Sequence, residues 1–196
     1  MSVVLPEGRF RAIYADPPWN FVTRWAQART TGANGRRPKY DLMTTDEIAA
    51  MPVADVASDD CVLFLWACWP NLMDAFRVIE GWGFTYKTCA FAWMKANNKQ
   101  PDMFRDDVDA HIGLGYWTRA NSEPCLLATR GNPKRLSAGV RQGIIEPRRQ
   151  HSRKPDCVPG RIEQLVEGPY LELFARTTRP GWTVWGNQTD KFPEAA

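Results

Sequence analysis

The stretch "RAIYADPPWN", residues 11–20, decides how the rest of the sequence is interpreted. Its first five residues form a short, mainly apolar run, which is typical of a buried strand. Asp16 follows directly, and then come Pro17 and Pro18, which have a fixed φ and no N–H to donate. We expect Trp19 to follow as an exposed indole. This acceptor-rich corner indicates a binding or catalytic site, and a tight turn with a packed tryptophan is the alternative.

Apolar runs bounded by turn residues predict seven strands and three helices. Thr44 and Glu47 have the spacing of a helix capping box. The alternation of strands and helices predicts an α/β sheet covered by helices on both faces, with ligands binding beyond the carboxyl ends of its strands. The predicted strands are 11–15, 61–66, 84–94, 124–130, 142–146, 170–175 and 182–186, and the predicted helices are 45–51, 71–80 and 159–167.

Composition indicates an ordinary globular chain. The 196 residues are 44% hydrophobic and 24% charged, so we expect a single domain over residues 1–196. We find no signal peptide and no apolar run long enough to span a membrane. The five cysteines are scattered and never spaced as C-x-x-C, which argues against a zinc site or a disulfide framework and predicts a reducing, cytoplasmic location.

The net charge of +3 hides a strong segregation of charge. Residues 24–40 and 130–154 together carry thirteen Lys and Arg residues and one acid. They overlap two predicted long loops, at about 20–43 and 131–150, and loops of that length are uncommon unless they are functional or disordered. We therefore expect two basic substrate loops that bind nucleic acid, with a solvated surface as the alternative.

The corner itself suits a reaction in which an aromatic amine attacks an electrophile. The lone pair of adenine's 6-amino group is delocalised into the ring, and two acceptors that hold its hydrogens would free it. The Asp16 carboxylate and the Pro17 carbonyl are suitable acceptors. Trp19 would offer a face on which a base removed from its stack could lie.

The corner also belongs to an ordered series of motifs. "ADPPW" is followed by "WGF", "GYWTRANSEPCLLATRG", "HSRKPD", "ELFAR" and "GWTVWGNQ", from about residue 11 to 188. In this order they resemble the adenine-N(6) methyltransferases named after the seventy-kilodalton catalytic subunit of the messenger-RNA methyltransferase. The resemblance implies a Rossmann-like class I fold that uses S-adenosyl-L-methionine (SAM). It also implies a permuted motif order, with the catalytic corner first and the main cofactor strand near the C-terminus.

The resemblance implies a role for each matching residue. The catalytic corner is Asp16, Pro17, Pro18 and Trp19, and the cofactor would be held by Asp16, Lys154, Glu172, Phe174, Arg176, Asn187 and Gln188. Lys154 would meet the cofactor carboxylate, and Asn187 and Gln188 the ribose hydroxyls. A strand-end salt bridge is the alternative for Glu172, and no metal is implied.

Other residues are assigned from their surroundings in the sequence. Glu123 is expected to orient Arg119 or Arg130, whereas Thr178 and Arg179 are given no role. Substrate contacts are expected from Trp19 and from the basic loops, in particular Arg36, Arg37, Arg148 and Arg149.

The sequence thus predicts methyl transfer from SAM to the 6-amino group of adenine in a polynucleotide. DNA is favoured over RNA because compact members of the family resemble DNA-modifying enzymes. The same reaction on RNA is the first alternative, and a non-catalytic subunit that binds nucleic acid is the second. A homo-oligomer or a partner subunit stays open, as do the target sequence and the strand preference.

Overall fold

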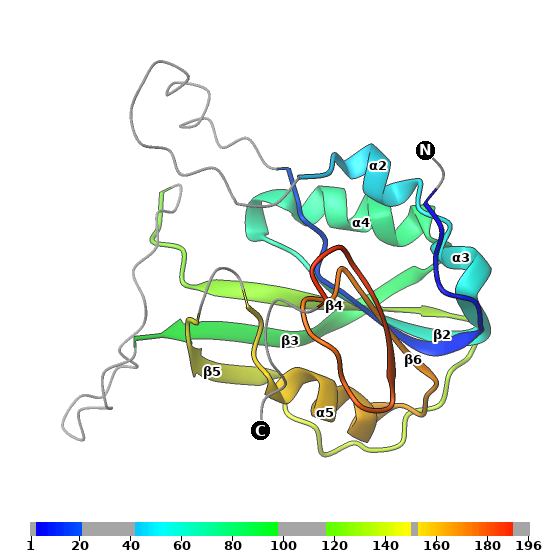
Figure 1. Ribbon diagram of the computed structural model, residues 1–196. Helices are drawn as coiled ribbons and strands as arrows, with labels where there is room; N and C mark the ends of the chain where they lie inside the picture. The colour runs from blue at the N-terminus through cyan, green and yellow to red at the C-terminus, as the bar shows by residue number, and fades with distance from the viewer. Residues whose placement is uncertain (1–2, 21–41, 98–116, 150–152, 190–196) are drawn as a thin grey trace.

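A computed structural model describes residues 3–20, 42–97, 117–149 and 153–189 (Figure 1). Its centre is a seven-stranded sheet with the order β5-β3-β4-β2-β1-β6-β7. The strands are β1 (Phe10–Ala15), β2 (Ala57–Trp66), β3 (Thr85–Ala96), β4 (Ser122–Arg130), β5 (Gly143–Pro147), β6 (Tyr170–Leu173) and β7 (Trp182–Trp185). The α/β class predicted from the sequence is confirmed.

The strand directions bring most of the carboxyl ends to one edge of the sheet. β1 lies between β2 and β6 and is parallel to both, and β7 extends the sheet in parallel beside β6. β4 runs antiparallel to β2 and to β3, and β5 runs parallel to β3. The start of β4 therefore meets the carboxyl ends of the other six strands, which is where an α/β sheet places its ligands.

The helices are α2 (Thr45–Ala49), α3 (Val53–Val56), α4 (Leu72–Gly81) and α5 (Cys157–Leu165), with a short 3₁₀ turn, η1 (Trp69–Asn71), before α4. The predicted capping box begins α2. The Thr44 hydroxyl accepts from the Glu47 N–H at 3.2 Å, and the Glu47 carboxylate accepts from the Thr44 N–H at 2.7 Å. This pair satisfies donors that the first turn of a helix otherwise leaves unbonded.

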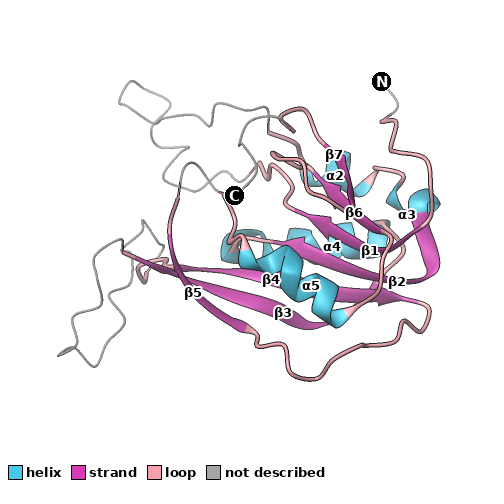
Figure 2. Ribbon diagram, turned by 60° about the horizontal axis from the view of Figure 1, so that its bottom comes forward, coloured by secondary structure: helices cyan, strands magenta, loops and turns pink. Residues whose placement is uncertain are grey.

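Alternation along the central strands divides the core into two clusters. Ile13 of β1 packs in one cluster with Ile79 of α4, and Phe64 of β2 packs in the other with Ile162 of α5. Figures 1 and 2 show α2 and α4 on one side of the sheet and α5 on the other. Burying each such side chain stabilises the fold by roughly 1.5–3 kcal/mol.

The predicted strands and helices are all present, with ends that differ by a few residues. β6 ends at Leu173, two residues earlier than predicted, because Phe174 turns the chain with a φ of 61°. The short elements α3 and η1 were not predicted. Within the described ranges, none of the helices is both long and apolar enough to cross a membrane.

Candidate functional site

The catalytic corner is held by its own backbone and by the chain at Met43. The Trp19 N–H donates to the Pro17 carbonyl at 2.9 Å, and the Met43 N–H donates to the Pro18 carbonyl at 2.9 Å. The Asn20 N–H returns a bond to the Met43 carbonyl at 3.0 Å. A carbonyl oxygen has two lone pairs, so the Pro17 carbonyl can accept one further hydrogen bond.

Trp19 is not the exposed indole that the sequence predicted. Its side chain is only 6% exposed and packs in the core cluster that contains Ile13. The indole N–H donates to the Trp66 carbonyl at 3.0 Å. The expectation failed because it overlooked the core beneath the corner, where an indole can bury its ring and still satisfy its N–H. Trp19 therefore anchors the corner to the end of β2.

Asp16 lies at the end of a chain of alternating charges. Its Oδ1 is 2.8 Å from Nζ of Lys154, whose Nζ is also 3.3 Å from Oε2 of Glu123. Glu123 forms a further ion pair with Lys95. All four side chains are between 12% and 21% exposed, so solvent screens these pairs less than it would on the surface. The Lys154 ammonium also lies 5.4 Å from the centre of the Trp66 ring.

The partners of Glu123 differ from those expected. The sequence suggested Arg119 or Arg130, but Glu123 pairs with Lys95 and Lys154. Nη1 of Arg130 instead donates to the Ala54 carbonyl at 2.7 Å. Burial opposes ionisation of Glu123, yet the two lysines outweigh it and hold its pKa below the ordinary value.

The same competition acts on Lys154. Burial disfavours its ammonium, but the charges of Asp16 and Glu123 prevail and hold its pKa above the ordinary value. The sequence placed Lys154 against the cofactor carboxylate. In the structure, the charged Lys154 ammonium forms an ion pair with one carboxylate oxygen of Asp16. An ammonium has three donors, so Lys154 can still bind a further acceptor.

A cleft opens at the carboxyl ends of β1 and β6. Five of the seven predicted cofactor residues line it, whereas Asn187 and Gln188 are not among the described residues that do so. The lining is formed by Tyr14, Asp16, Arg153, Lys154, Pro155, Asp156, Pro159, Glu172, Phe174, Arg176, Thr177 and Arg179.

Glu172 and Arg179 form an imperfect pair in this cleft. Nε of Arg179 is 3.7 Å from Oε2 of Glu172, and neither buried atom has a hydrogen-bond partner among the residues that the structure describes. Burial raises the pKa of Glu172 to about 7, with Arg179 opposing the shift and Asp16 adding to it. Glu172 thus pairs with an arginine, which was the alternative considered for it, and it also lines the cleft, so its cofactor role stays a prediction. The structure also places Arg179, which was given no role, in the cleft wall.

Phe174 turns the chain out of β6 in a backbone conformation that side chains rarely adopt. Its φ is 61°, and its ring meets that of Trp185 edge to face at 5.6 Å. The Ala175 N–H donates to the Trp185 carbonyl at 2.9 Å. A Cβ at Gly186 would lie 2.5 Å from the Ala175 carbonyl oxygen, so only glycine permits this approach. These contacts fix the end of β7, where the exposed Asn187 and the half-buried Gln188 follow.

Of the two basic residues after β5 that were expected to contact phosphate, one is paired with an acid. Arg148 is exposed just after β5. Arg149 lies 2.5 Å from Asp156 and also donates to the Lys154 carbonyl at 3.5 Å. Asp156 pairs with Arg153 as well. Arg149 thus links Asp156 to the segment that carries Lys154, and its expected phosphate contact stays a prediction. Arg36 and Arg37 lie outside the described residues.

Sequence reasoning missed Tyr14 and Asp156 as cleft residues. Tyr14 lies opposite Glu172 in the β1–β6 register, and its hydroxyl accepts from the Trp66 indole N–H at 2.8 Å. Strand alternation places Tyr14 and Asp16 on one face, so the signal was present in the opening stretch. Asp156 stood within "HSRKPD", but its pairing with Arg149 could not be inferred from spacing alone.

Comparison with known proteins adds an independent finding. The model of the MT-A70 family matches residues 10–188. The chain is 29% identical to the type II methyltransferase M.MunI of Mycoplasma sp over 93% of this chain and 78% of that protein. It is also 29% identical to the human N(6)-adenosine-methyltransferase catalytic subunit METTL3, over 93% of this chain but only 29% of that protein. A Drosophila melanogaster N(6)-adenosine-methyltransferase MT-A70-like protein is 29% identical over 27% of its length.

Proposed function

Because the chain belongs to the MT-A70 family, we propose that it transfers a methyl group from SAM to the 6-amino group of adenine in DNA. The family predicted from the "ADPPW" corner and its companion motifs is thereby confirmed. The observation that carries the proposal is the position of Asp16, which lies both at the corner and in the wall of the cleft, paired with Lys154.

We infer that the fold is Rossmann-like, with its motifs in permuted order and its sheet covered on both faces. In support, the corner after β1 precedes "ELFAR" in the sequence, and β6, which contains the first residues of "ELFAR", lies beside β1 in the sheet. We also infer one methyltransferase domain over residues 1–196. Free thiols at all five cysteines support a reducing, cytoplasmic location.

The cleft residues fit the cofactor of a SAM-dependent methyltransferase. SAM carries an ammonium, a carboxylate and ribose hydroxyls, and its sulfonium supplies an electrophilic methyl group when it is bound. Oε2 of Glu172 and Nε of Arg179 are a buried acceptor and a buried donor with no hydrogen bond. Leaving such a group unsatisfied costs about 1–3 kcal/mol, so a polar ligand is favoured here.

The cofactor contacts follow from charge. Asp16 and Glu172 would hold cationic or hydroxyl groups, and Lys154 would hold the carboxylate with its one remaining donor. Phe174 and Arg176 would complete the wall. Asn187 and Gln188 would meet the ribose from the end of β7, just outside the lining residues.

At the corner, this chain would hold the amine and stabilise its developing charge. The Asp16 carboxylate and the free lone pair of the Pro17 carbonyl would accept the two amine hydrogens, which directs the nitrogen lone pair toward the methyl group. Asp16 would stabilise the positive charge that forms on nitrogen, as preorganised charges do in transition states, until the nitrogen releases one of its two protons to water. Lys154 fixes Oδ1 of Asp16 and leaves Oδ2 for the substrate.

DNA is proposed over RNA because of how much of each relative's length this chain spans. The chain spans 78% of the Mycoplasma type II methyltransferase but less than a third of METTL3 and of the Drosophila protein. The similarity to N(6)-adenosine-methyltransferases keeps RNA adenosine as the second candidate substrate. The intact corner argues against a non-catalytic subunit. We propose that the basic segments, including Arg36, Arg37 and Arg148, contact the phosphates.

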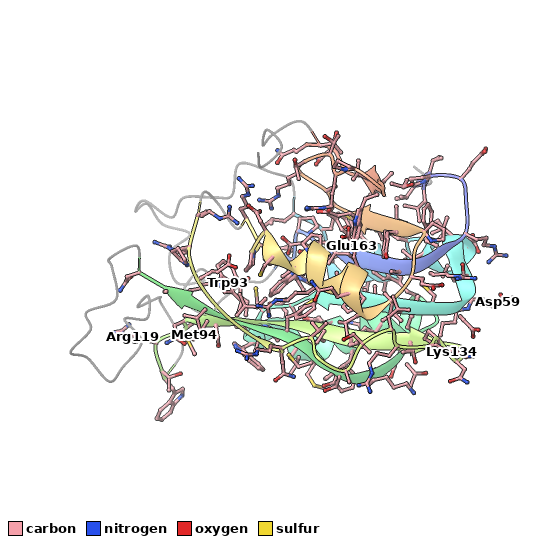
Figure 3. All side chains as sticks on the ribbon, turned by 90° about the horizontal axis from the view of Figure 1, so that it is seen from below. Asp59, Trp93, Met94, Arg119, Lys134 and Glu163 are labelled. Carbon is pink, nitrogen blue, oxygen red and sulfur yellow. The ribbon has the colours of Figure 1, made fainter. Side chains whose placement is uncertain are left out.

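Methyl transfer from labelled SAM tests the proposal. Unmethylated DNA and RNA are treated with the protein, digested and resolved as nucleosides, and we expect N(6)-methyldeoxyadenosine from the DNA. Asp16→Asn should slow formation of the product by roughly 10²–10³ or more. Asp59→Asn is the matched control, because Asp59 is exposed at the opposite end of the sheet (Figure 3). Label on cytosine, or only on RNA, would contradict the proposed substrate.

A further inference from the structure

Trp69 presents an aromatic ring at the surface just beyond the carboxyl end of β2. It is the first residue of η1, and its side chain is 52% exposed. The indole N–H donates to Oγ of Ser122 at 3.0 Å. This bond satisfies the ring's single donor and fixes its edge, while half of the side chain remains in contact with solvent.

Two lines of contact place this ring beside the catalytic corner. Ser122 precedes Glu123, which pairs with Lys154, and Lys154 pairs with Asp16. Cys68 precedes Trp69, and its thiol pKa is raised to about 11, first by burial and then by the charges of Glu123 and Asp16, with Lys154 opposing. The charges at the corner therefore act on the residue next to Trp69.

The same end of the sheet carries a further cation, Arg119. Ser122 lies opposite Met94 in the β3–β4 register. Figure 3 shows Met94 and Arg119 at one end of the sheet, and Asp59 and Lys134 at the other. Arg119 is exposed, and Trp117 nearby in the chain is 93% exposed. Aromatic rings and positive charge on one surface are the combination that binds single-stranded nucleic acid.

We propose that Trp69 stacks against a nucleobase of the strand segment that carries the target adenine. This proposal rests on the proposed function, and it names the contact that holds the substrate at that site. Base stacking tolerates any sequence, because every base has a π-face. It also supplies the stacking surface that was expected from Trp19, whose ring is buried.

Three variants separate stacking from other uses of the ring. Trp69→Ala removes it, Trp69→Leu keeps an apolar side chain without a ring, and Trp69→Phe keeps a ring that can stack. Tyr86→Leu is the matched control, because Tyr86 is an exposed aromatic near the start of β3, away from the corner. The probe is a single-stranded oligothymidylate that contains one adenine with 2-aminopurine beside it.

Affinity is measured by fluorescence anisotropy, and stacking by quenching of 2-aminopurine. Trp69→Ala and Trp69→Leu should each lose at least about fivefold in affinity, together with the quenching. Trp69→Phe and Tyr86→Leu should stay close to wild type. Wild-type affinity in Trp69→Leu would overturn the proposal, because apolar contact would then suffice. Unchanged oligonucleotide binding by Trp69→Ala, together with a smaller size-exclusion mass than the wild type has, would overturn it in favour of a protein interface.

The assay also separates this proposal from the function on which it rests. If wild-type protein methylates adenine and Trp69→Ala binds the probe equally well, the stacking proposal alone fails. If the ring quenches the probe as described but no N(6)-methyldeoxyadenosine forms, the proposed reaction alone fails.

Discussion

Lys154 and Asp16 form an ion pair of 2.8 Å at the point where the catalytic corner meets the cleft. The pair joins the two halves of the proposed site, because Asp16 follows β1 and Lys154 precedes α5. One carboxylate oxygen is thereby fixed, and the ammonium, which also pairs with Glu123, retains one donor for a ligand.

Lys154→Ala should weaken SAM binding by roughly 1.5–3 kcal/mol, because it removes a charge-assisted contact. Titration calorimetry measures this loss. Lys95→Ala is the matched control, since Lys95 pairs with Glu123 and has no ion pair with Asp16 among the described contacts. Equal affinities for the wild type and Lys154→Ala would remove Lys154 from the cofactor site.

Trp19→Ala should lower the free energy of unfolding by about 3–5 kcal/mol, since it empties a buried site and breaks the bond to the Trp66 carbonyl. Urea unfolding measures the change. Trp69→Ala, at a half-exposed tryptophan, should cost clearly less. If the two substitutions cost the same, the corner is not anchored through Trp19.

These two tryptophans show where sequence reasoning succeeded and where it stopped. The strands were predictable because apolar runs and alternation depend on near neighbours, and α2 was predictable from Thr44 and Glu47. The burial of Trp19 depends on the distant carbonyl of Trp66, and the pairing of Glu123 with Lys95 and Lys154 depends on sheet order. Neither follows from local spacing.

The predicted cofactor residues divide in the same way. Motif order placed Asp16, Lys154 and Glu172 in one site, and the cleft does contain all three. Motif order could not show that Arg179 pairs with Glu172. That pairing depends on the turn at Phe174, whose backbone conformation the sequence does not reveal.

Arg148 and Arg149 should differ in their effect on nucleic-acid binding. Arg148→Ala should reduce the slope of log affinity against log salt by about 1, as the loss of one phosphate contact does. Arg149→Ala should change the slope less, because its guanidinium is paired with Asp156. Fluorescence anisotropy across a salt series measures both slopes, and the opposite ranking would show that Arg149 leaves Asp156 to bind phosphate.

Glu172 should make stability depend on pH. Its pKa is raised from 4.5 to about 7, so between these values the folded chain holds a proton that the unfolded chain releases. The free energy of unfolding contributed by this group therefore falls as pH rises through that window. Urea unfolding at about pH 5 and about pH 8 should show a smaller fall in Glu172→Gln than in wild type.

The matched control for this pH dependence is Glu167→Gln. Glu167 is an exposed acid that pairs with Arg11 at 3.2 Å. Its removal should leave most of the wild-type dependence in place. Identical pH dependence in wild type and Glu172→Gln would mean that Glu172 ionises normally in the folded chain.

Asp16 is proposed to stabilise the positive charge that develops on the adenine nitrogen. Single-turnover methyl transfer by Asp16→Asn at saturating SAM tests this role most directly. The substitution keeps the side chain's size but removes its negative charge, and saturation separates chemistry from cofactor affinity. We expect the rate to fall by roughly 10²–10³ or more, as when one preorganised electrostatic contact is lost. A thermal melt checks that the variant is folded. A folded Asp16→Asn protein that transfers methyl at nearly the wild-type rate would contradict the account.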